Sequence, residues 1–175
     1  MKKILMMLAV GAFAMGLGTT AAVVLRDKAA TKTDSSAATK IWQQKFADLA
    51  GKKQDLSQWK GKPLVLNFWA TWCAPCREEM PEFMELHKQY EKRVGFVGIA
   101  IDNPAEVQKF VKELKIEYPI LLGEQDALDL MRAEGNRVGG LPFTLIFDAK
   151  GNKVAVVAGR LTKAKLEAYL KPLVS

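Results

Sequence analysis

From residue 41 onward, the apolar and polar residues alternate between strand-like and helix-like patterns. The stretches 46–49 and 54–56 flank a turn around Gly51 and predict a β-hairpin. The run 64–69, LVLNFW, is apolar at every position but one and predicts a buried strand. The pattern then changes, and we expect a helix to begin near Cys73.

A second strand and a second helix follow in the same order. The strand 95–101 leads into Asp102-Asn103-Pro104, which supplies an N-cap followed by a proline at the first helical position, where no N–H is required. Apolar residues then recur with helical spacing at Val107, Phe110, Val111 and Leu114. This helix is therefore expected to pack one face inward.

The remainder of the chain predicts further elements of both kinds. They are a short strand at 119–122, a helix at 127–133, a break at Gly139-Gly140, an antiparallel hairpin of strands 143–147 and 153–157, and a last helix with Thr162 as its N-cap. Leu161 and Leu166 are placed to form a hydrophobic staple across the start of that helix. Together the elements predict an α/β fold: a central mixed sheet with helices on both faces, with strand 64–69 in its centre.

The N-terminal residues 1–25 follow a different pattern. Lys2 and Lys3 precede the uncharged run 4–25, which as a helix would measure about 33 Å, enough to span the hydrocarbon core of a bilayer. We expect a membrane anchor or signal segment, and we favour an uncleaved anchor that leaves the rest of the chain outside the cytoplasmic membrane. A cleaved signal peptide is the alternative, because residues 19–21, Thr-Thr-Ala, loosely match a cleavage site.

Residues 26–40 contain no apolar residue larger than Ala and predict a flexible linker, which leaves 41–175 as one globular domain. The formal charge of +7 lies largely near the N-terminus, since only +3 falls within 41–175. Lys and Arg in this domain are scattered among Glu and Asp, without the clustered basic residues and interleaved aromatics of a nucleic-acid-binding surface. We therefore expect no nucleic-acid partner.

Cys73 and Cys76 are the only two cysteines, and their spacing fits a metal site, a structural disulfide or a redox pair. Structural zinc needs four ligands, and the single histidine, His87, would lie about 16 Å from Cys76 along a helix. His87 is better explained as a hydrogen-bonded core histidine. Copper bound by the two thiolates alone stays open. A structural disulfide across so short a loop would stabilise the fold little.

A redox pair explains the surroundings of the two cysteines best. Cys73 is expected at the N-terminus of a helix, where unpaired N–H groups and the helix dipole stabilise a thiolate. Cys76 lies three residues later on the same helical face and about one turn deeper. We therefore expect Cys73 to be the nucleophile and Cys76 to resolve the mixed disulfide.

The stretch 67–83, NFWATWCAPCREEMPEF, resembles the active-site segment of the thioredoxin superfamily, and most of all its membrane-tethered TlpA/ResA-like reductases. Pro81 falls where these folds kink their first long helix. GGLPF at 139–143 resembles the loop that carries their cis-proline, and 146–170 is similar to their closing hairpin and helix. The segment 104–135 resembles the helix-strand insertion of this branch. The resemblance implies a thioredoxin-like fold.

The resemblance also implies roles for residues around the cysteines. Pro142 is expected to follow a cis peptide bond beside the disulfide, and the backbone of Leu141 to pair with an extended substrate. Trp72 either fills space or shapes the docking of partner proteins. Ala74 and Pro75 lack the histidine of strongly oxidising relatives, which favours a reductant.

Two positions depart from the thioredoxin pattern. Asn67 stands where thioredoxin has a buried acid that accepts the proton of the deeper cysteine, so another group, such as Glu79 or a water molecule, has to take that proton. Glu78, Glu79 and Glu82 are otherwise expected to decorate an exposed helix face. Phe143 replaces the small polar residue that commonly follows the cis-proline, and is expected to alter substrate docking.

Together these observations predict a thiol:disulfide oxidoreductase that reduces protein disulfides at the extracytoplasmic face of the membrane. We expect a monomer with no metal and no cofactor beyond the redox-active disulfide Cys73–Cys76. The resemblance implies a membrane electron donor similar to DsbD or CcdA, and roles such as cytochrome c maturation or electron supply to another periplasmic thiol enzyme. The alternatives are a copper or haem-delivery chaperone that binds through the two thiols, and a disulfide-forming oxidant.

Overall fold

The computed structural model describes residues 40–174. Within this range no helix is long and apolar enough to cross a membrane. The predicted N-terminal segment 1–25 and all of the predicted linker 26–40 except Lys40 lie outside the described residues.

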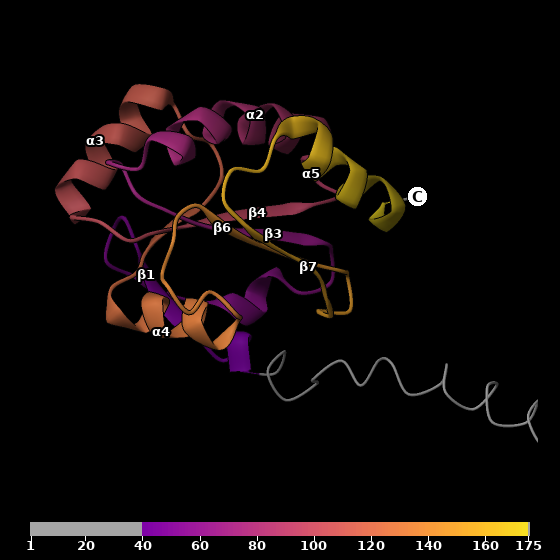
Figure 1. Ribbon diagram of the computed structural model, residues 1–175, viewed down its shortest axis with the longest axis horizontal. Coiled ribbons are helices and arrows are strands. Elements are labelled where there is room, and N and C mark those ends of the chain that lie inside the picture. The colour runs from indigo at the N-terminus through magenta and orange to yellow at the C-terminus, as the bar shows by residue number, and fades with distance from the viewer. Residues whose placement is uncertain (1–39, 175) are drawn as a thin grey trace, which may run out of the picture. The chain divides into compact units, whose positions relative to one another are not determined.

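The described residues form one mixed sheet of seven strands (Figure 1). The strands are β1 (Lys45–Asp48), β2 (Lys53–Asp55), β3 (Leu64–Trp69), β4 (Gly95–Ala100), β5 (Ile120–Leu122), β6 (Phe143–Phe147) and β7 (Lys153–Ala158). They lie in the order β2-β1-β5-β4-β3-β6-β7. β3, β4 and β5 are parallel, and the hairpins β1–β2 and β6–β7 join the sheet in antiparallel orientation. β3 therefore lies inside the sheet between β4 and β6, one place from the middle strand β4.

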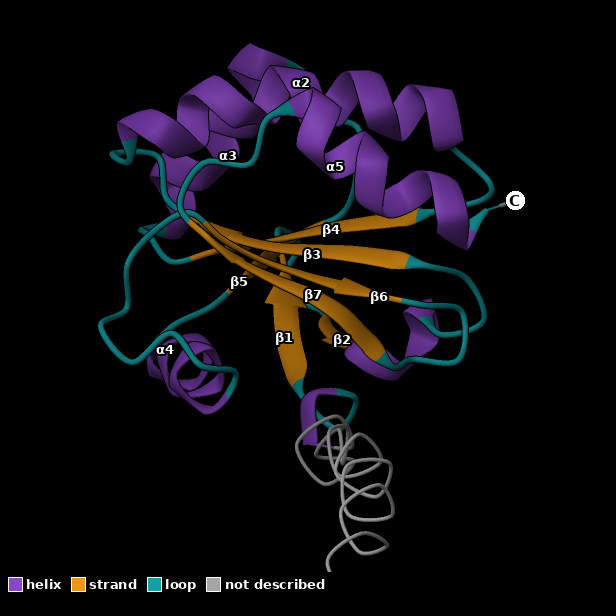
Figure 2. Ribbon diagram, turned by 45° about the vertical axis from the view of Figure 1, so that its right-hand side comes forward, coloured by secondary structure: helices purple, strands orange, loops and turns teal. Residues whose placement is uncertain are grey.

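Helices cover both faces of this sheet, as Figure 2 shows. Three of them lie on one face: α2 (Ala74–Tyr90), α3 (Pro104–Leu114) and α5 (Lys163–Leu170), which continues into the short 3₁₀ helix η2 (Lys171–Leu173). The other face carries α4 (Gln125–Ala133) and the 3₁₀ helix η1 (Leu56–Trp59). The predicted α/β, thioredoxin-like arrangement is thus confirmed, and the predicted insertion 104–135 contains α3, β5 and α4.

The two faces of the sheet bury two separate sets of side chains, because successive side chains of a strand point to opposite faces. Along β3, Val65 and Trp69 face α2, whereas Leu64, Leu66 and Phe68 face α4. We call the first set, with Cys73, Cys76, Met80, Phe83, Leu86, Phe110, Ile146 and Leu166, the α2-face core. The second set, with Ile41, Trp42, Phe46, Leu130, Phe143, Leu145 and Phe147, is the α4-face core.

The predicted start of α3 is confirmed. Asn103 is its N-cap and accepts a hydrogen bond from the N–H of Ala105 (2.9 Å), and Pro104 occupies the first helical position. Of its predicted apolar stripe, the helix buries Val107 and Phe110 against the sheet, whereas Val111 is half-buried and Leu114 is exposed. It ends at Lys115, whose left-handed backbone closes the last turn.

Candidate active site

Cys73 and Cys76 lie where β3 leads into α2, and they form a disulfide with an Sγ–Sγ distance of 2.15 Å. Cys73 is the N-cap of α2, and its sulfur accepts a hydrogen bond from the N–H of Cys76 (3.4 Å). The side chain of Cys76 is fully buried, whereas Cys73 keeps 5% of its surface exposed. The structure therefore places the first cysteine at the helix start and the second deeper, as the sequence predicts.

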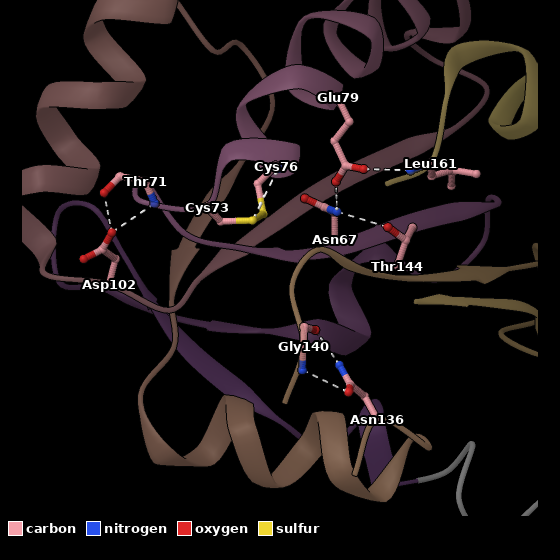
Figure 3. The surroundings of a disulfide bond; sticks show 10 residues. All are labelled: Asn67, Thr71, Cys73, Cys76, Glu79, Asp102, Asn136, Gly140, Thr144 and Leu161. Atoms are coloured by element: carbon pink, nitrogen blue, oxygen red, sulfur yellow. Dashed lines mark hydrogen bonds between the residues drawn. A yellow bond between two sulfur atoms is a disulfide. The ribbon is translucent and has the colours of Figure 1, made fainter. Parts of the chain in front are cut away.

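The loop before the disulfide is held by a carboxylate from the neighbouring strand. Asp102 follows β4, and its Oδ2 accepts hydrogen bonds from both the N–H (2.9 Å) and the hydroxyl of Thr71 (Figure 3). Trp72 comes next and has 69% of its surface exposed, which rules out a space-filling role in the core. Ala74 and Pro75, between the cysteines, are also exposed.

A second loop reaches the same end of the sheet. Phe68 of β3 pairs with Phe143 of β6. The loop that follows β3 and the loop that precedes β6 therefore meet at the same end of these two strands. The peptide bond between Leu141 and Pro142 is cis, as expected, and Leu141 is half-buried.

Asn136 fixes the conformation of this second loop. Its Nδ2 donates to the carbonyl of Gly140 (2.7 Å), and its Oδ1 accepts from the N–H of Gly140 (3.2 Å), as Figure 3 shows. Asn136 is 6% exposed, whereas Val138, inside the loop that it closes, is 93% exposed. One buried amide thus supports a loop that presents an apolar side chain to solvent.

Phe143 does not lie on the docking surface, and the expectation that it alters substrate docking is wrong. Its ring is fully buried in the α4-face core and contacts Phe68, with ring centroids 5.9 Å apart. The physical reason is strand alternation: as the first residue of β6, Phe143 points away from the disulfide face, toward α4.

Glu79 is the least expected residue of the site, because a carboxyl group on the charged stretch of α2 is fully buried. One of its oxygens accepts from Asn67 Nδ2 (2.8 Å) and the other from the N–H of Leu161 (2.9 Å) (Figure 3). Asn67 Nδ2 also donates to the hydroxyl of Thr144 on β6 (3.0 Å). Burial raises the pKa of Glu79 from 4.5 to about 7, against the lowering effect of these hydrogen bonds and of Arg160. Glu79 is therefore poised to exchange a proton near neutral pH.

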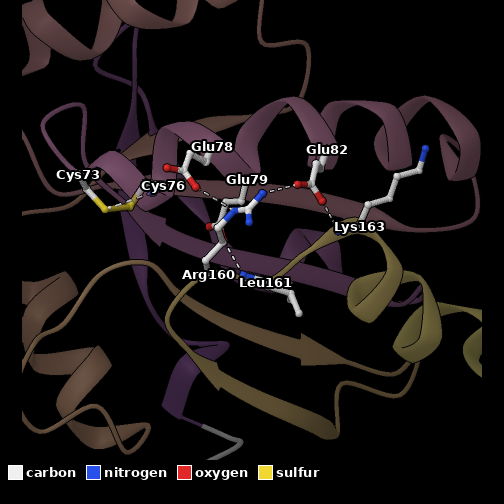
Figure 4. A network of polar contacts seen from close by, with 8 residues as sticks. All are labelled: Cys73, Cys76, Glu78, Glu79, Glu82, Arg160, Leu161 and Lys163. Atoms are coloured by element: carbon white, nitrogen blue, oxygen red, sulfur yellow. Dashed lines mark hydrogen bonds and ion pairs between the residues drawn. A yellow bond between two sulfur atoms is a disulfide. The ribbon is translucent and has the colours of Figure 1, made fainter.

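The neighbouring glutamates attach α2 to the segment before α5, as Figure 4 shows. Arg160 forms ion pairs with Glu78 (3.3 Å) and Glu82 (2.7 Å), and Glu82 also accepts a hydrogen bond from the N–H of Lys163. Thr162 is the N-cap of α5 but makes no side-chain capping bond, so Glu82 supplies that acceptor from another helix. The expected exposed face is therefore wrong for Glu79, holds for Glu78, and holds only in part for Glu82, whose side chain is half-buried.

No three His, Cys, Asp or Glu side chains are grouped between residues 40 and 174 so that they could hold a metal ion. His87 packs edge-on against Phe96 and Tyr118, with ring centroids 5.5 and 5.8 Å away. Burial lowers the pKa of His87 below its ordinary value. Its Nδ1 has no hydrogen-bond partner among the described residues, so the expected hydrogen bond of a core histidine is absent there.

Sequence reasoning gave Glu79 only a minor place and missed the two loop supports, Asp102 and Asn136. A signal for Glu79 exists, because it lies three residues after Cys76 and four before Phe83, on the inward stripe of α2. Asp102 acts across 31 residues, and the Asn136 bonds depend on loop conformation. No pattern of spacing could reveal those two.

Comparisons with known proteins agree with this geometry. The model of the AhpC/TSA family matches residues 36–156. The thiol-disulfide oxidoreductase ResA of Geobacillus thermodenitrificans is 34% identical over 130 residues, which cover 73% of this chain and 72% of that protein. ResA of Bacillus thuringiensis is 38% identical over 128 residues, 72% of each chain.

A similar solved structure is that of a thiol:disulfide interchange protein of the thioredoxin family from Chlorobium tepidum. It is 28% identical, covers 75% of this chain and 93% of its own, and has a TM-score of 0.69. Fold, disulfide and sequence therefore agree: the chain belongs to the AhpC/TSA family, is similar to the ResA proteins within it, and is a thiol:disulfide oxidoreductase of thioredoxin-like fold.

Proposed function

We propose that this enzyme reduces disulfide bonds of other proteins outside the cytoplasmic membrane, with Cys73 as the nucleophile and Cys76 as the resolving cysteine. The unequal placement of the two sulfurs carries the proposal. Cys73 caps the N-terminus of α2 and is the more exposed, whereas Cys76 is fully buried. A helix start favours the thiolate, which is the attacking form.

The reaction begins with the reduced pair. The Cys73 thiolate attacks one sulfur of the partner disulfide, a mixed disulfide forms, and the other partner sulfur leaves as a thiolate. The Cys76 sulfur then attacks Cys73, which releases the second partner thiolate and forms the Cys73–Cys76 disulfide. Two electrons pass to the partner, and the disulfide itself is the only redox group that the cycle needs. Because both cysteines lie in one turn, the second step is intramolecular and fast.

Glu79 is the group we propose as acceptor of the Cys76 proton. It lies one helical turn after Cys76, is fully buried, and has a pKa raised to about 7 by that burial. The carboxylate can therefore take the thiol proton as Cys76 attacks, and return it to solvent between cycles. Asn67 cannot do this, since an amide oxygen is too weak a base.

The partner is expected to dock at the end of the sheet where the loop that carries the disulfide meets the loop that carries Pro142. The exposed Trp72 and the half-buried Leu141 flank this edge, with Pro142 next to Leu141. The backbone of Leu141 would pair with an extended segment of the partner, and Pro142 would pack against the sulfurs. These three residues are therefore proposed as the substrate-binding set, with Ala74 and Pro75 shaping the turn between the cysteines.

The direction of electron flow follows from the dipeptide Ala74-Pro75. It supplies neither a positive charge nor a histidine to stabilise the thiolate further, so the disulfide should be comparatively hard to reduce. In an oxidising compartment the pair must be re-reduced, and we propose a membrane electron donor similar to DsbD or CcdA. Cytochrome c thiols awaiting haem, or another periplasmic thiol enzyme, fit as substrates.

A redox titration of the domain, read through tryptophan fluorescence and paired with reduction of insulin disulfides, tests the reaction. A potential near that of thioredoxin, about −270 mV, or lower, together with insulin reduction, supports the reductase. A potential near about −120 mV, the range of the oxidant DsbA, would instead indicate a disulfide-forming enzyme. Stoichiometric copper binding without insulin reduction would indicate a metal chaperone.

The location is tested separately by cell fractionation. The uncharged run 4–25 leads us to expect the full-length chain in the membrane fraction, with its domain on the extracytoplasmic side. Deletion of residues 1–40 should leave a soluble domain with full reductase chemistry in vitro. A soluble periplasmic protein that begins near Ala22 would show instead that the segment is a cleaved signal peptide.

A further inference from the structure

The side-chain amide of Asn67 uses only one of its two ends. Its Nδ2 donates to both Glu79 and Thr144, whereas its Oδ1 is buried and has no hydrogen-bond partner among the residues described. Asn67 itself is 1% exposed. A buried carbonyl oxygen without a donor costs free energy, so a role for this oxygen in another state of the protein would explain why it is kept.

The orientation of this amide follows from its neighbours. An ionised Glu79 carboxylate only accepts hydrogen bonds, so the nitrogen of Asn67 must face it and the oxygen must face elsewhere. β3 alternation directs the Asn67 side chain toward α2, where Cys76 precedes Glu79 by one turn. In Figure 3 the Asn67 oxygen points toward the side on which the Cys73–Cys76 disulfide lies, and away from Glu79 and Thr144.

We propose that Asn67 Oδ1 accepts a hydrogen bond from the thiol of Cys76 in the reduced protein. The disulfide form offers no such donor, because the Cys76 sulfur then carries no proton. Reduction creates the S–H group on the same face of β3. The unpartnered oxygen is thus the acceptor for a donor that exists in only one redox state.

This inference rests on the proposed function and assigns Asn67 a positioning role in it. One amide would hold the Cys76 thiol through its oxygen and the Glu79 carboxylate through its nitrogen, and so keep the two groups adjacent. When Cys76 attacks the mixed disulfide, its proton moves to Glu79, the Cys73–Cys76 bond forms, and the bond from Cys73 to the partner breaks. Asn67 neither gains nor loses a proton.

Infrared spectroscopy of the S–H stretching band tests the hydrogen bond directly. In a Cys73→Ala background Cys76 is the only thiol, so the band has one source. Adding Asn67→Ala should move the band to higher frequency, since the thiol loses its acceptor. Asn67→Leu, which fills the space, should do the same if the alanine variant folds poorly. Thr144→Val removes a neighbouring bond to the same amide and should leave the band in place.

An S–H band at the same frequency in folded Asn67→Ala and Thr144→Val proteins would overturn the inference. Single-turnover kinetics of the two-cysteine enzyme give the second readout. Asn67→Ala should slow the release of the partner roughly tenfold while mixed-disulfide formation keeps its rate, because the variant loses the amide that holds both Cys76 and Glu79.

The two proposals fail in different ways. If the parent enzyme reduces insulin but the S–H band does not respond to Asn67, only the role of Asn67 is wrong. If the parent enzyme reduces no protein disulfide, the proposed function is wrong. A shifted band would then show that Asn67 binds the Cys76 thiol, but in a protein with a different function.

Discussion

The two faces of the sheet bury side chains of different kinds. On the α2 face, Asn67, Glu79 and Thr144 form a polar cluster between β3, β6 and α2. On the α4 face, the core consists of apolar side chains, and the buried polar residues Glu134 and Asn136 come only after the end of α4. The difference indicates that both faces stabilise the fold through apolar burial, and that the α2 face also gives up some stability to bury polar groups beside the disulfide.

The α4 face can be weakened without touching the chemistry. Phe147 is fully buried there, and its ring meets Trp42 edge-on with centroids 4.9 Å apart. Phe147→Ala should lower the free energy of unfolding by about 3–5 kcal/mol through the lost burial and the cavity. Urea unfolding measures this. Insulin reduction per folded molecule should not change. A loss of activity in the fully folded variant would mean that the α4-face core also takes part in the reaction.

The α2 face should give a pH dependence of stability that comes from Glu79. Its pKa is raised by burial from 4.5 to about 7. The associated stability is therefore fully present below pH 4.5 and is lost as the pH rises through about 7, a change of roughly 3 kcal/mol. Arg160 and Glu82 act on the same carboxyl group in opposite directions.

The measurement is the difference in unfolding free energy between the parent protein and Glu79→Gln across this interval. The difference is needed because His87, whose pKa is lowered by burial, contributes with the opposite sign and cancels in it. A constant difference from pH 4.5 to 8 would mean that folding does not raise the pKa of Glu79.

Activity should respond to Glu79 more than to its neighbour on the helix surface. Glu79→Gln removes the proposed proton acceptor and should slow release of the partner about 100-fold, equivalent to about 2.7 kcal/mol of activation free energy. Glu78→Gln is the matched control, since Glu78 is exposed and, among the described residues, pairs with Arg160 alone. If the two variants released the partner at equal rates in single-turnover experiments, Glu79 would not be the proton acceptor.

The smallest effect is expected in the loop 136–140, which Asn136 closes and which we propose lies beside the docked partner. Asn136→Ala frees the loop that presents Val138, and should raise KM for insulin about fivefold, the equivalent of one hydrogen-bonded contact. A small organic disulfide, which does not need this loop, should react at the parent rate. Asn152→Ala is the control, because Asn152 makes a similar side-chain bond to Asp148 in the β6–β7 turn (2.9 Å). The same KM in both variants would contradict a docking role.

Much of this arrangement could be predicted from sequence because it depends on local signals. The apolar run of β3, the N-cap position of Cys73 and the Asn103-Pro104 start of α3 each follow from neighbouring residues. Leu161 and Leu166, predicted as a staple, are both buried in the α2-face core.

The polar contacts could not be predicted, because they join distant parts of the chain. The place of Glu79 on the inward stripe of α2 indicates its burial, but its partners Asn67 and the N–H of Leu161 come from distant parts of the chain. Glu82 caps α5 across 81 residues, although Thr162 has the residue type that a cap prefers. Residue type alone does not show which acceptor a folded chain will use.

Cys73 and Cys76 are expected to play different roles in the reaction, and trapping of partner proteins distinguishes these roles. Single-cysteine variants are mixed with a disulfide-containing protein, and the mixed disulfides are separated on non-reducing gels. Cys76→Ser should accumulate a stable mixed disulfide through Cys73, because nothing resolves it, whereas Cys73→Ser should trap almost none, because Cys76 is fully buried. Trapping by Cys73→Ser and not by Cys76→Ser would mean instead that Cys76 is the nucleophile.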